Sequence, residues 1–106
     1  MEIIEVHTTI ESQEAAQKIA QALVSQHLAA CVQVAGPINS TFWWDGEMSQ
    51  SEEWICTAKT RKALFDQVEQ AIRQVHTYQE PEILGVDVTA GSQSYLAWIE
   101  KETQGV

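Results

Sequence analysis

The fold of this chain is decided by the stretch Ser40-Thr41-Phe42-Trp43-Trp44-Asp45-Gly46, which ends in an Asp-Gly pair flanked by strand-forming residues. Such a pair is typical of a two-residue β-hairpin turn. The sequence predicts one strand over residues 30–44 and the next over residues 47–60. The strand before the turn would run for about 50 Å, which is much longer than an ordinary strand. We therefore expect a long hairpin at the centre of the fold.

Strand and helix patterns alternate on both sides of this hairpin. The predicted elements are a strand over 2–10, a helix from Ser12 to about His27, a helix over 62–75, a strand over 82–90 and a short helix capped by Ser92. The order β-α-β-β-α-β-α is that of an α+β, ferredoxin-like split-βαβ fold. Right-handed crossovers then predict an antiparallel sheet of order 4-1-3-2, with the two main helices on one face. Residues 1–106 are expected to form a single domain.

The charge balance limits the kinds of partner that this chain can have. The formal net charge is −9, from 15 acidic and 6 basic residues. Binding to nucleic acid needs clustered basic residues, so we expect no nucleic-acid partner. No apolar stretch approaches the length of a membrane span, and the first residues do not resemble a signal peptide. We therefore expect a soluble, cytoplasmic protein with no membrane partner.

The outer half of the hairpin should extend beyond the rest of the sheet. It carries the large apolar side chains of Phe42, Trp43, Trp44, Met48 and Trp54. An isolated two-stranded ribbon is marginally stable, and exposed aromatic residues on it favour association. We expect each ribbon to pack on a neighbouring copy in a closed homo-oligomer, with these Phe and Trp side chains in the interface. A monomer with a loose arm is the alternative.

The hairpin register also bears on the two cysteines. With a two-residue turn, Cys31 faces Thr60 and Cys56 faces Ala35, so the thiols lie about 13 Å apart along the ribbon. This separation is outside the reach of a disulfide bond. A bulge at Gly36-Pro37 would shift the register by one residue without closing the gap. We therefore expect two free thiols.

Two histidines are candidates for binding a divalent metal ion. His7 lies near the end of the strand over 2–10, and His76 follows the helix over 62–75, which should end on the same side of the domain. A neutral imidazole is the commonest protein ligand for ions such as copper and zinc. Structural alternatives are a helix cap for His76, an interface hydrogen bond for His7 and a surface cap for His27. Strand parity turns His7 away from the helices, so the two rings would meet only across a subunit contact or not at all.

A second group of candidates surrounds the expected ribbon. Lys59 is a lone cation at a strand end, which indicates an ion pair with Glu53 or with a carboxylate of a neighbouring copy. An anion-binding role is the alternative for this lysine. Glu80 and Glu82 are read as a solvated loop rather than as metal ligands. We find no phosphate-binding loop, zinc motif or catalytic triad, so we expect no enzyme activity.

Five segments, taken in order, resemble the divalent-cation tolerance protein CutA family over nearly the whole chain. They are Leu28-Ala29-Ala30-Cys31-Val32, Ser40 to Gly46, Glu53 followed by Lys59-Thr60, His76-Thr77-Tyr78-Gln79-Glu80-Pro81-Glu82, and Tyr95-Leu96-Ala97-Trp98. The resemblance implies a cytoplasmic homotrimer whose long hairpins wrap neighbouring subunits. It also implies a role in tolerance of divalent metals, copper above all.

The resemblance further implies which residues bind metal. Some family members look like copper binders that use a Cys at the end of the first strand and His residues before the Tyr of a His-x-Tyr motif. In this chain His7 stands at the first position, His76 is retained, and Val75 stands where some members have a second His. Two imidazoles suit copper(II) or another divalent cation, bound weakly, because the thiolate that prefers copper(I) is missing.

A second hypothesis places function in clefts between subunits. Trimers of the nitrogen-regulatory PII type have a similar subunit fold, so a signalling or scaffold role follows by fold analogy. Clefts lined by Lys59, Tyr78 and the ribbon residue Trp44, with Glu53 and Glu80 nearby, would bind a small anion or a partner protein.

Overall fold

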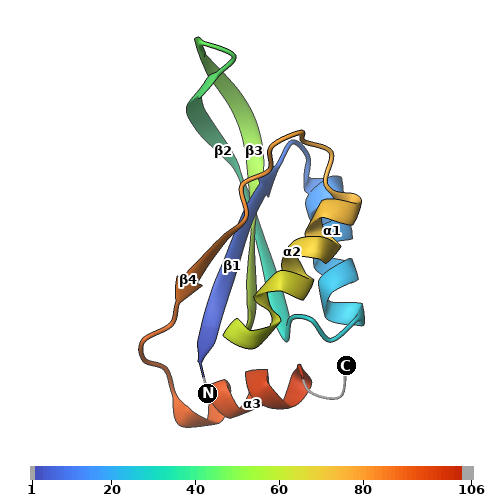
Figure 1. Cartoon of the computed structure of the whole chain (residues 1–106), viewed down its shortest axis with the longest axis vertical. Helices are drawn as coiled ribbons and strands as arrows, with labels where there is room; N and C mark the ends of the chain where they lie inside the picture. Colours follow the sequence, from blue (N-terminus) through green and yellow to red (C-terminus); the bar gives the residue numbers. More distant parts are fainter. Residues whose placement is uncertain (1, 104–106) are drawn as a thin grey trace.

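The computed structural model describes residues 2–103, so the domain predicted over 1–106 extends beyond the described residues at both ends. Its elements are β1 (Ile3–Ile10), α1 (Gln13–Ser25), β2 (Cys31–Trp44), β3 (Glu47–Arg61), the 3-10 turn η1 (Lys62–Leu64), α2 (Phe65–Val75), β4 (Leu84–Asp87) and α3 (Gln93–Glu102). The sheet order is β2-β3-β1-β4, which is the predicted order 4-1-3-2 read from the other edge (Figure 1). All three pairings are antiparallel, which confirms the predicted α+β, ferredoxin-like fold.

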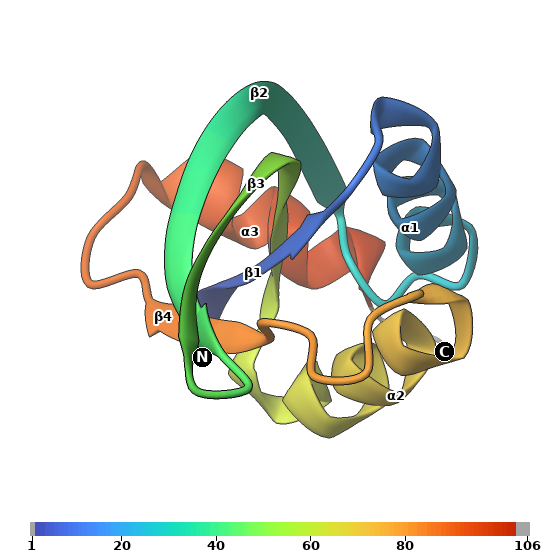
Figure 2. The same cartoon turned by 90° about the horizontal axis from the view of Figure 1, so that it is seen from above.

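Helices α1 and α2 cover one face of the sheet (Figure 2). Ser12 caps α1, since its side chain accepts a hydrogen bond from the Ala15 amide at 3.0 Å. The apolar stripes of the two helices bury Ile19 and Val68, both fully inaccessible to solvent, against β1 and β3. Burial of a side chain of this size contributes about 1.5–3 kcal/mol. The core of the molecule lies between these helices and the sheet.

The central hairpin projects from the sheet as predicted. β1 ends at Ile10, opposite Trp54, whereas β2 and β3 remain paired from Ile38 and Glu53 out to the turn. At the turn, Asp45 has φ 53° and Gly46 has φ 78°, the left-handed backbone that a type I′ turn requires. The projecting ribbon accounts for the elongated shape, with extents of 44 × 26 × 22 Å.

The register of the hairpin shifts by one residue at its root. The bulge lies between Ala35 and Ile38, where the sequence has Gly36-Pro37. As a result Cys31 pairs with Lys59, and Cys56 pairs with Val34, each one position from the expected partner. Both cysteines are free, as predicted. Burial raises the pKa of the Cys56 thiol to about 11.

Two predicted boundaries were wrong. β4 covers only Leu84–Asp87 instead of 82–90, although the Val88 amide still donates to the Ile3 carbonyl at 3.0 Å. Alternation of apolar residues shows which side chains share a face, but the length of an edge strand depends on its partner. Helix α1 ends at Ser25 because His27 takes a left-handed backbone (φ 57°), and its Nδ1 lies 2.9 Å from the Glu102 carbonyl oxygen.

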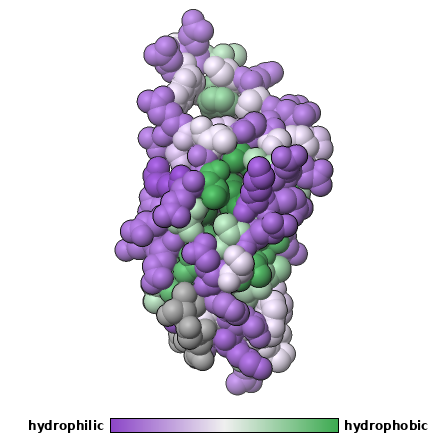
Figure 3. All heavy atoms as spheres, turned by 90° about the vertical axis from the view of Figure 1, so that its right-hand side faces the viewer, coloured by the Kyte–Doolittle hydropathy of each residue, from purple (hydrophilic) through white to green (hydrophobic). Residues whose placement is uncertain are grey.

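The opposite face of the sheet is covered only at one end, where α3 lies across the end of the molecule away from the hairpin tip (Figure 1). We call the remainder the uncovered face. It exposes Leu84 and Val86 of β4, at 57% and 46%, which pair with His7 and Glu5 of β1. The side of the molecule that carries α1 is mostly hydrophilic, with an apolar seam (Figure 3). In residues 2–103, no helix is both long enough and apolar enough to cross a membrane.

Candidate functional site

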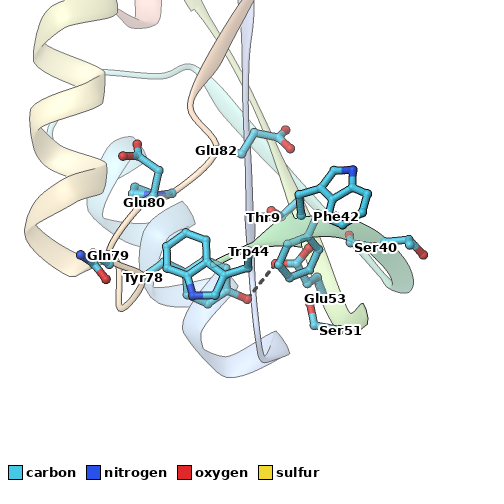
Figure 4. Close-up of a pocket in the computed structure, with 13 residues that line it drawn as sticks. Thr9, Ser40, Phe42, Trp44, Ser51, Glu53, Tyr78, Gln79, Glu80 and Glu82 are labelled. Carbon is cyan, nitrogen blue, oxygen red and sulfur yellow. Dashed lines mark hydrogen bonds between the residues drawn. The ribbon is translucent and has the colours of Figure 1, made fainter. Parts of the chain in front are cut away.

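A cleft of about 900 Å³ lies between the projecting ribbon and the loop over residues 76–83 (Figure 4). We call it the root cleft. Its lining residues are Thr9, Ser40, Thr41, Phe42, Trp43, Trp44, Ser51, Glu53, Tyr78, Gln79, Glu80, Pro81 and Glu82. Aromatic rings and three glutamates dominate this lining, and none of these residues is basic. The predicted candidates Glu53, Tyr78, Glu80 and Trp44 are therefore brought together.

The centre of the root cleft is a hydrogen bond between Tyr78 and Glu53. The Tyr78 hydroxyl donates to Glu53 Oε2 at 2.7 Å (Figure 4). Glu53 is only 6% exposed. Burial raises the pKa of Tyr78 far above its usual value, helped by the hydrogen bond and by the charges of Glu53 and Glu11. The phenol therefore stays neutral and remains a donor.

His76 fixes the loop that forms one wall of the root cleft. Its backbone amide closes α2 by donating to Ile72, as expected of a helix cap. Its Nδ1 accepts the Tyr78 amide at 3.1 Å, so Nε2 carries the proton and donates to the Thr9 carbonyl at 2.8 Å. The His76 and Tyr78 rings also meet edge to face, with centroids 4.8 Å apart. Both ring nitrogens of His76 are thus occupied.

His7 has different partners. It lies on the uncovered face, where β1 pairs it with Thr57 and Leu84, and its Nε2 is 3.0 Å from Glu5 Oε1. In the described part of the chain, no group of three or more His, Cys, Asp or Glu side chains is placed to hold a metal ion. Within one folded chain, His7 and His76 therefore do not fit a closed copper site.

Lys59 lies away from the root cleft of its own chain. On β3 it pairs with Cys31 and Glu5, and its ammonium group is 5.5 Å from the centre of the Tyr95 ring. Glu53 is six positions along the same strand, about 20 Å away. The expected ion pair between Lys59 and Glu53 of the same chain is therefore wrong.

The ribbon aromatics divide into two groups. Trp43, Trp44 and Phe42 are exposed by 75%, 48% and 39%. Trp54 instead packs against the core of its own chain, at the root of the ribbon. A Cβ on Gly36 would lie only 2.7 Å from Trp54 Cδ1, so this close approach requires glycine. Three of the four predicted interface aromatics are free to meet a neighbour.

Sequence reasoning missed several contacts of this site. The Thr77 hydroxyl donates to the Glu11 carboxylate at 2.8 Å, which ties the loop to the end of β1. The Thr9 carbonyl that accepts from His76 is a backbone group, so no residue type could have indicated it. The His-x-Tyr spacing was the available signal, because it places a ring next to an amide two residues later.

Comparisons with known proteins agree with this architecture. The family described as "CutA1 divalent ion tolerance protein" matches residues 4–102. "Protein CutA 1, chloroplastic" of Oryza sativa subsp. japonica is 32% identical over 101 residues, covering 95% of this chain and 57% of that protein. "Divalent-cation tolerance protein CutA" of Thermus thermophilus is 34% identical over 95 residues, covering 90% of this chain and 92% of that protein.

The crystal structure of CutA1 from Oryza sativa superposes with a TM-score of 0.95 at 30% identity, covering 100% of this chain and 97% of that one. This chain thus spans little more than half the length of the rice protein as it is curated, although it matches nearly all of the crystallised chain. The match extends over β1 to α3, including the hairpin and the loop that form the root cleft. The chain therefore belongs to the CutA1 divalent ion tolerance protein family.

Proposed function

We propose that this chain works as a cytoplasmic homotrimer in the tolerance of divalent cations, and that it binds cations rather than catalysing a reaction. The observation that carries the assembly is the uncovered face, which leaves Leu84 and Val86 exposed while the ribbon exposes Trp43. Apolar surfaces of this kind favour association. The number three comes from the family resemblance. The rice relative is named as chloroplastic, whereas we propose a cytoplasmic compartment for this chain.

A head-to-tail ring accounts for the arrangement of these surfaces. The sheet has two open edges, β2 and β4, at its opposite sides. A contact between two different surfaces closes into a ring when the rotation between copies permits it. In such a ring each ribbon packs on the next subunit, which supplies the support that a two-stranded ribbon lacks.

The cation is expected to bind weakly, as copper(II) or another divalent ion. His7 is the better candidate of the two histidines, because Glu5 is its only described partner and Nδ1 is not hydrogen-bonded within residues 2–103. His76 could bind a metal only by giving up the Tyr78 amide. The excess of acidic residues favours cations near the surface without selecting one.

Sedimentation and calorimetry test this proposal together. We expect a species of three chains, and weak, saturable binding of copper(II) that His7→Ala abolishes. His27→Ala is the matched control, since this imidazole lies at the end of α1 and contacts the Glu102 carbonyl. His76→Ala should leave binding in place while it loosens the loop. A single-chain species, or copper binding that is unaffected by His7→Ala, would contradict the proposal.

The second candidate is a signalling or scaffold trimer of the PII type. The size of the root cleft, about 900 Å³, favours it because this is enough for a small molecule or a peptide side chain. The lining from one chain is acidic, which is unfavourable for an anion. A thermal-shift screen of nucleotides beside metal ions separates the two functions, because only a true ligand raises the midpoint with saturation.

A further inference from the structure

The root cleft contains a buried negative charge without a positive partner. Glu53 is 6% exposed, and its one described hydrogen bond comes from the neutral Tyr78 hydroxyl. No Lys, Arg or His of residues 2–103 forms an ion pair with it. A buried carboxylate is costly unless a cation or several donors compensate it. The cleft therefore calls for a cation from outside the chain.

One half-buried lysine lacks a carboxylate partner in the part of the chain that the structure describes. Among the basic residues, Lys18, Lys62 and Arg73 have carboxylate partners, and Arg61 is hydrogen-bonded to Thr103. Lys59 is half-buried, with its ammonium group facing the Tyr95 ring and no carboxylate within ion-pair distance in the described residues. Lys101 also lacks a described carboxylate partner, but it is exposed on α3. Glu5 lies opposite Lys59 on β1 but is bonded to His7, so Lys59 is the half-buried cation of residues 2–103 that lacks a carboxylate within ion-pair distance.

We propose that Lys59 of one copy enters the root cleft of the next and pairs with its Glu53, an inference that rests on the proposed trimer. The apolar surroundings support this arrangement. Lys59 lies beside the exposed apolar residues of the uncovered face, and the cleft is flanked by the exposed Trp44 and Phe42 of the ribbon. Covering one apolar surface with the other brings the ammonium group and the carboxylate together. The cleft lining includes Trp43 and Trp44, and aromatic rings of this kind attract an ammonium group.

The contact also completes the site chemically. Glu53 Oε2 is taken by Tyr78, which leaves Oε1 as the free acceptor for an ammonium group. The pair is sheltered from water once the ribbon is covered. The Glu53 charge is then unpaired in a single chain and is neutralised in the assembly.

A double-mutant cycle tests the pairing. Within one chain the two residues are about 20 Å apart, so any direct coupling between them must act between copies. We expect Lys59→Met and Glu53→Gln each to raise the dissociation constant of the assembly roughly 30-fold or more, because either one leaves its partner charge buried alone. The double variant should be no weaker than the single ones. Lys101→Met is the matched control and should assemble like the parent.

Charge reversal gives a second readout. Lys59→Glu alone and Glu53→Lys alone should sediment as smaller species, whereas the chain carrying both changes should assemble again. Circular dichroism at the same concentrations shows whether each charge-reversal variant is folded. If one of these variants is unfolded, the double-mutant cycle still tests the pairing.

An additive cycle in an intact trimer would overturn this inference alone. A parent protein that sediments as one chain would overturn the trimer as well. Saturable binding of n-butylammonium to the parent trimer would mean that no lysine occupies the root clefts, and would overturn the pairing of Lys59 with Glu53.

Discussion

The two faces of the sheet are built from the same strands but differ in what covers them. On the helix side, Val6 of β1 and Cys56 of β3 are each 1% exposed beneath α1 and α2. On the other side, β4 exposes Leu84 and Val86 by 57% and 46%. One face is complete within a single chain, whereas the other presents apolar side chains that a single chain leaves in water.

This difference separates two roles of the hairpin. Its inner half belongs to the domain, since β3 is the partner of β1 and Trp54 packs on the core. Its outer half has only its own second strand, and it carries one wall of the root cleft. Folding and assembly are therefore expected to respond to different substitutions along the same two strands.

The largest effect should come from the helix-covered face. Ile19→Ala removes a fully buried side chain from the inner face of α1, and should lower the free energy of unfolding by about 2–5 kcal/mol. Met48→Ala, at a ribbon position that is 69% exposed, should instead alter mainly the concentration dependence of unfolding. Urea unfolding at several protein concentrations separates the two. Equal, concentration-independent losses would show that the two regions do not differ in this way.

A smaller effect is expected at the junction of the two regions. Tyr78→Phe leaves Glu53 Oε2 without its donor, and should cost about 1–3 kcal/mol. Tyr95→Phe is the matched control, because Tyr95 is 40% exposed and lies on α3 away from the root cleft. Thermal unfolding of both variants under identical conditions measures the difference. Indistinguishable midpoints would contradict a structural role for this bond.

The contribution of the Tyr78–Glu53 hydrogen bond to stability should also depend on pH in the alkaline range. Folding raises the pKa of Tyr78, so the unfolded chain releases this proton at a lower pH than the folded chain. The stabilisation that comes from the protonated Tyr78 hydroxyl is complete below about pH 10 and declines as the pH rises further. Cys56, whose pKa burial raises to about 11, acts in the same direction from about pH 9. Unfolding free energies measured between pH 8 and 11 should fall more steeply for the parent than for Tyr78→Phe, and parallel curves would contradict the prediction.

The smallest effect should be a gain in stability within the core. Thr8 is 1% exposed, and its hydroxyl oxygen has no hydrogen-bond partner among residues 2–103. Thr8→Val keeps the shape and removes this cost, so stability should rise by about 1 kcal/mol. Thr60→Val is the opposite control, because the Thr60 hydroxyl donates to the Leu28 carbonyl at 2.6 Å. Denaturant unfolding should therefore move the two variants in opposite directions.

Much of the fold could be predicted from residue patterns. The Asp45-Gly46 turn, the Ser12 cap and the apolar stripes of α1 and α2 are local signals, and the structure confirms each of them. The ends of β4 and the exact register at Gly36-Pro37 could not be predicted, because both depend on contacts with a second strand. The residue pattern indicated Glu53, Tyr78, Glu80 and Trp44 as candidates for the root cleft but did not indicate which of them pair. The partners of Glu53 and His76 depend on how the loop after α2 folds back, and one of them is a backbone carbonyl.

The hairpin tip is a suitable site for attaching a fluorescent label. A Cβ placed on Gly46 would meet no atom of the described residues within 4 Å, so the turn is open on that side. Only the left-handed backbone at Asp45 and Gly46 restricts what can stand there. A fluorophore attached through Glu47→Cys, at the first residue of β3, would lie at the far end of the ribbon. Energy transfer between donor-labelled and acceptor-labelled chains mixed in solution would then time the docking of one ribbon onto another subunit.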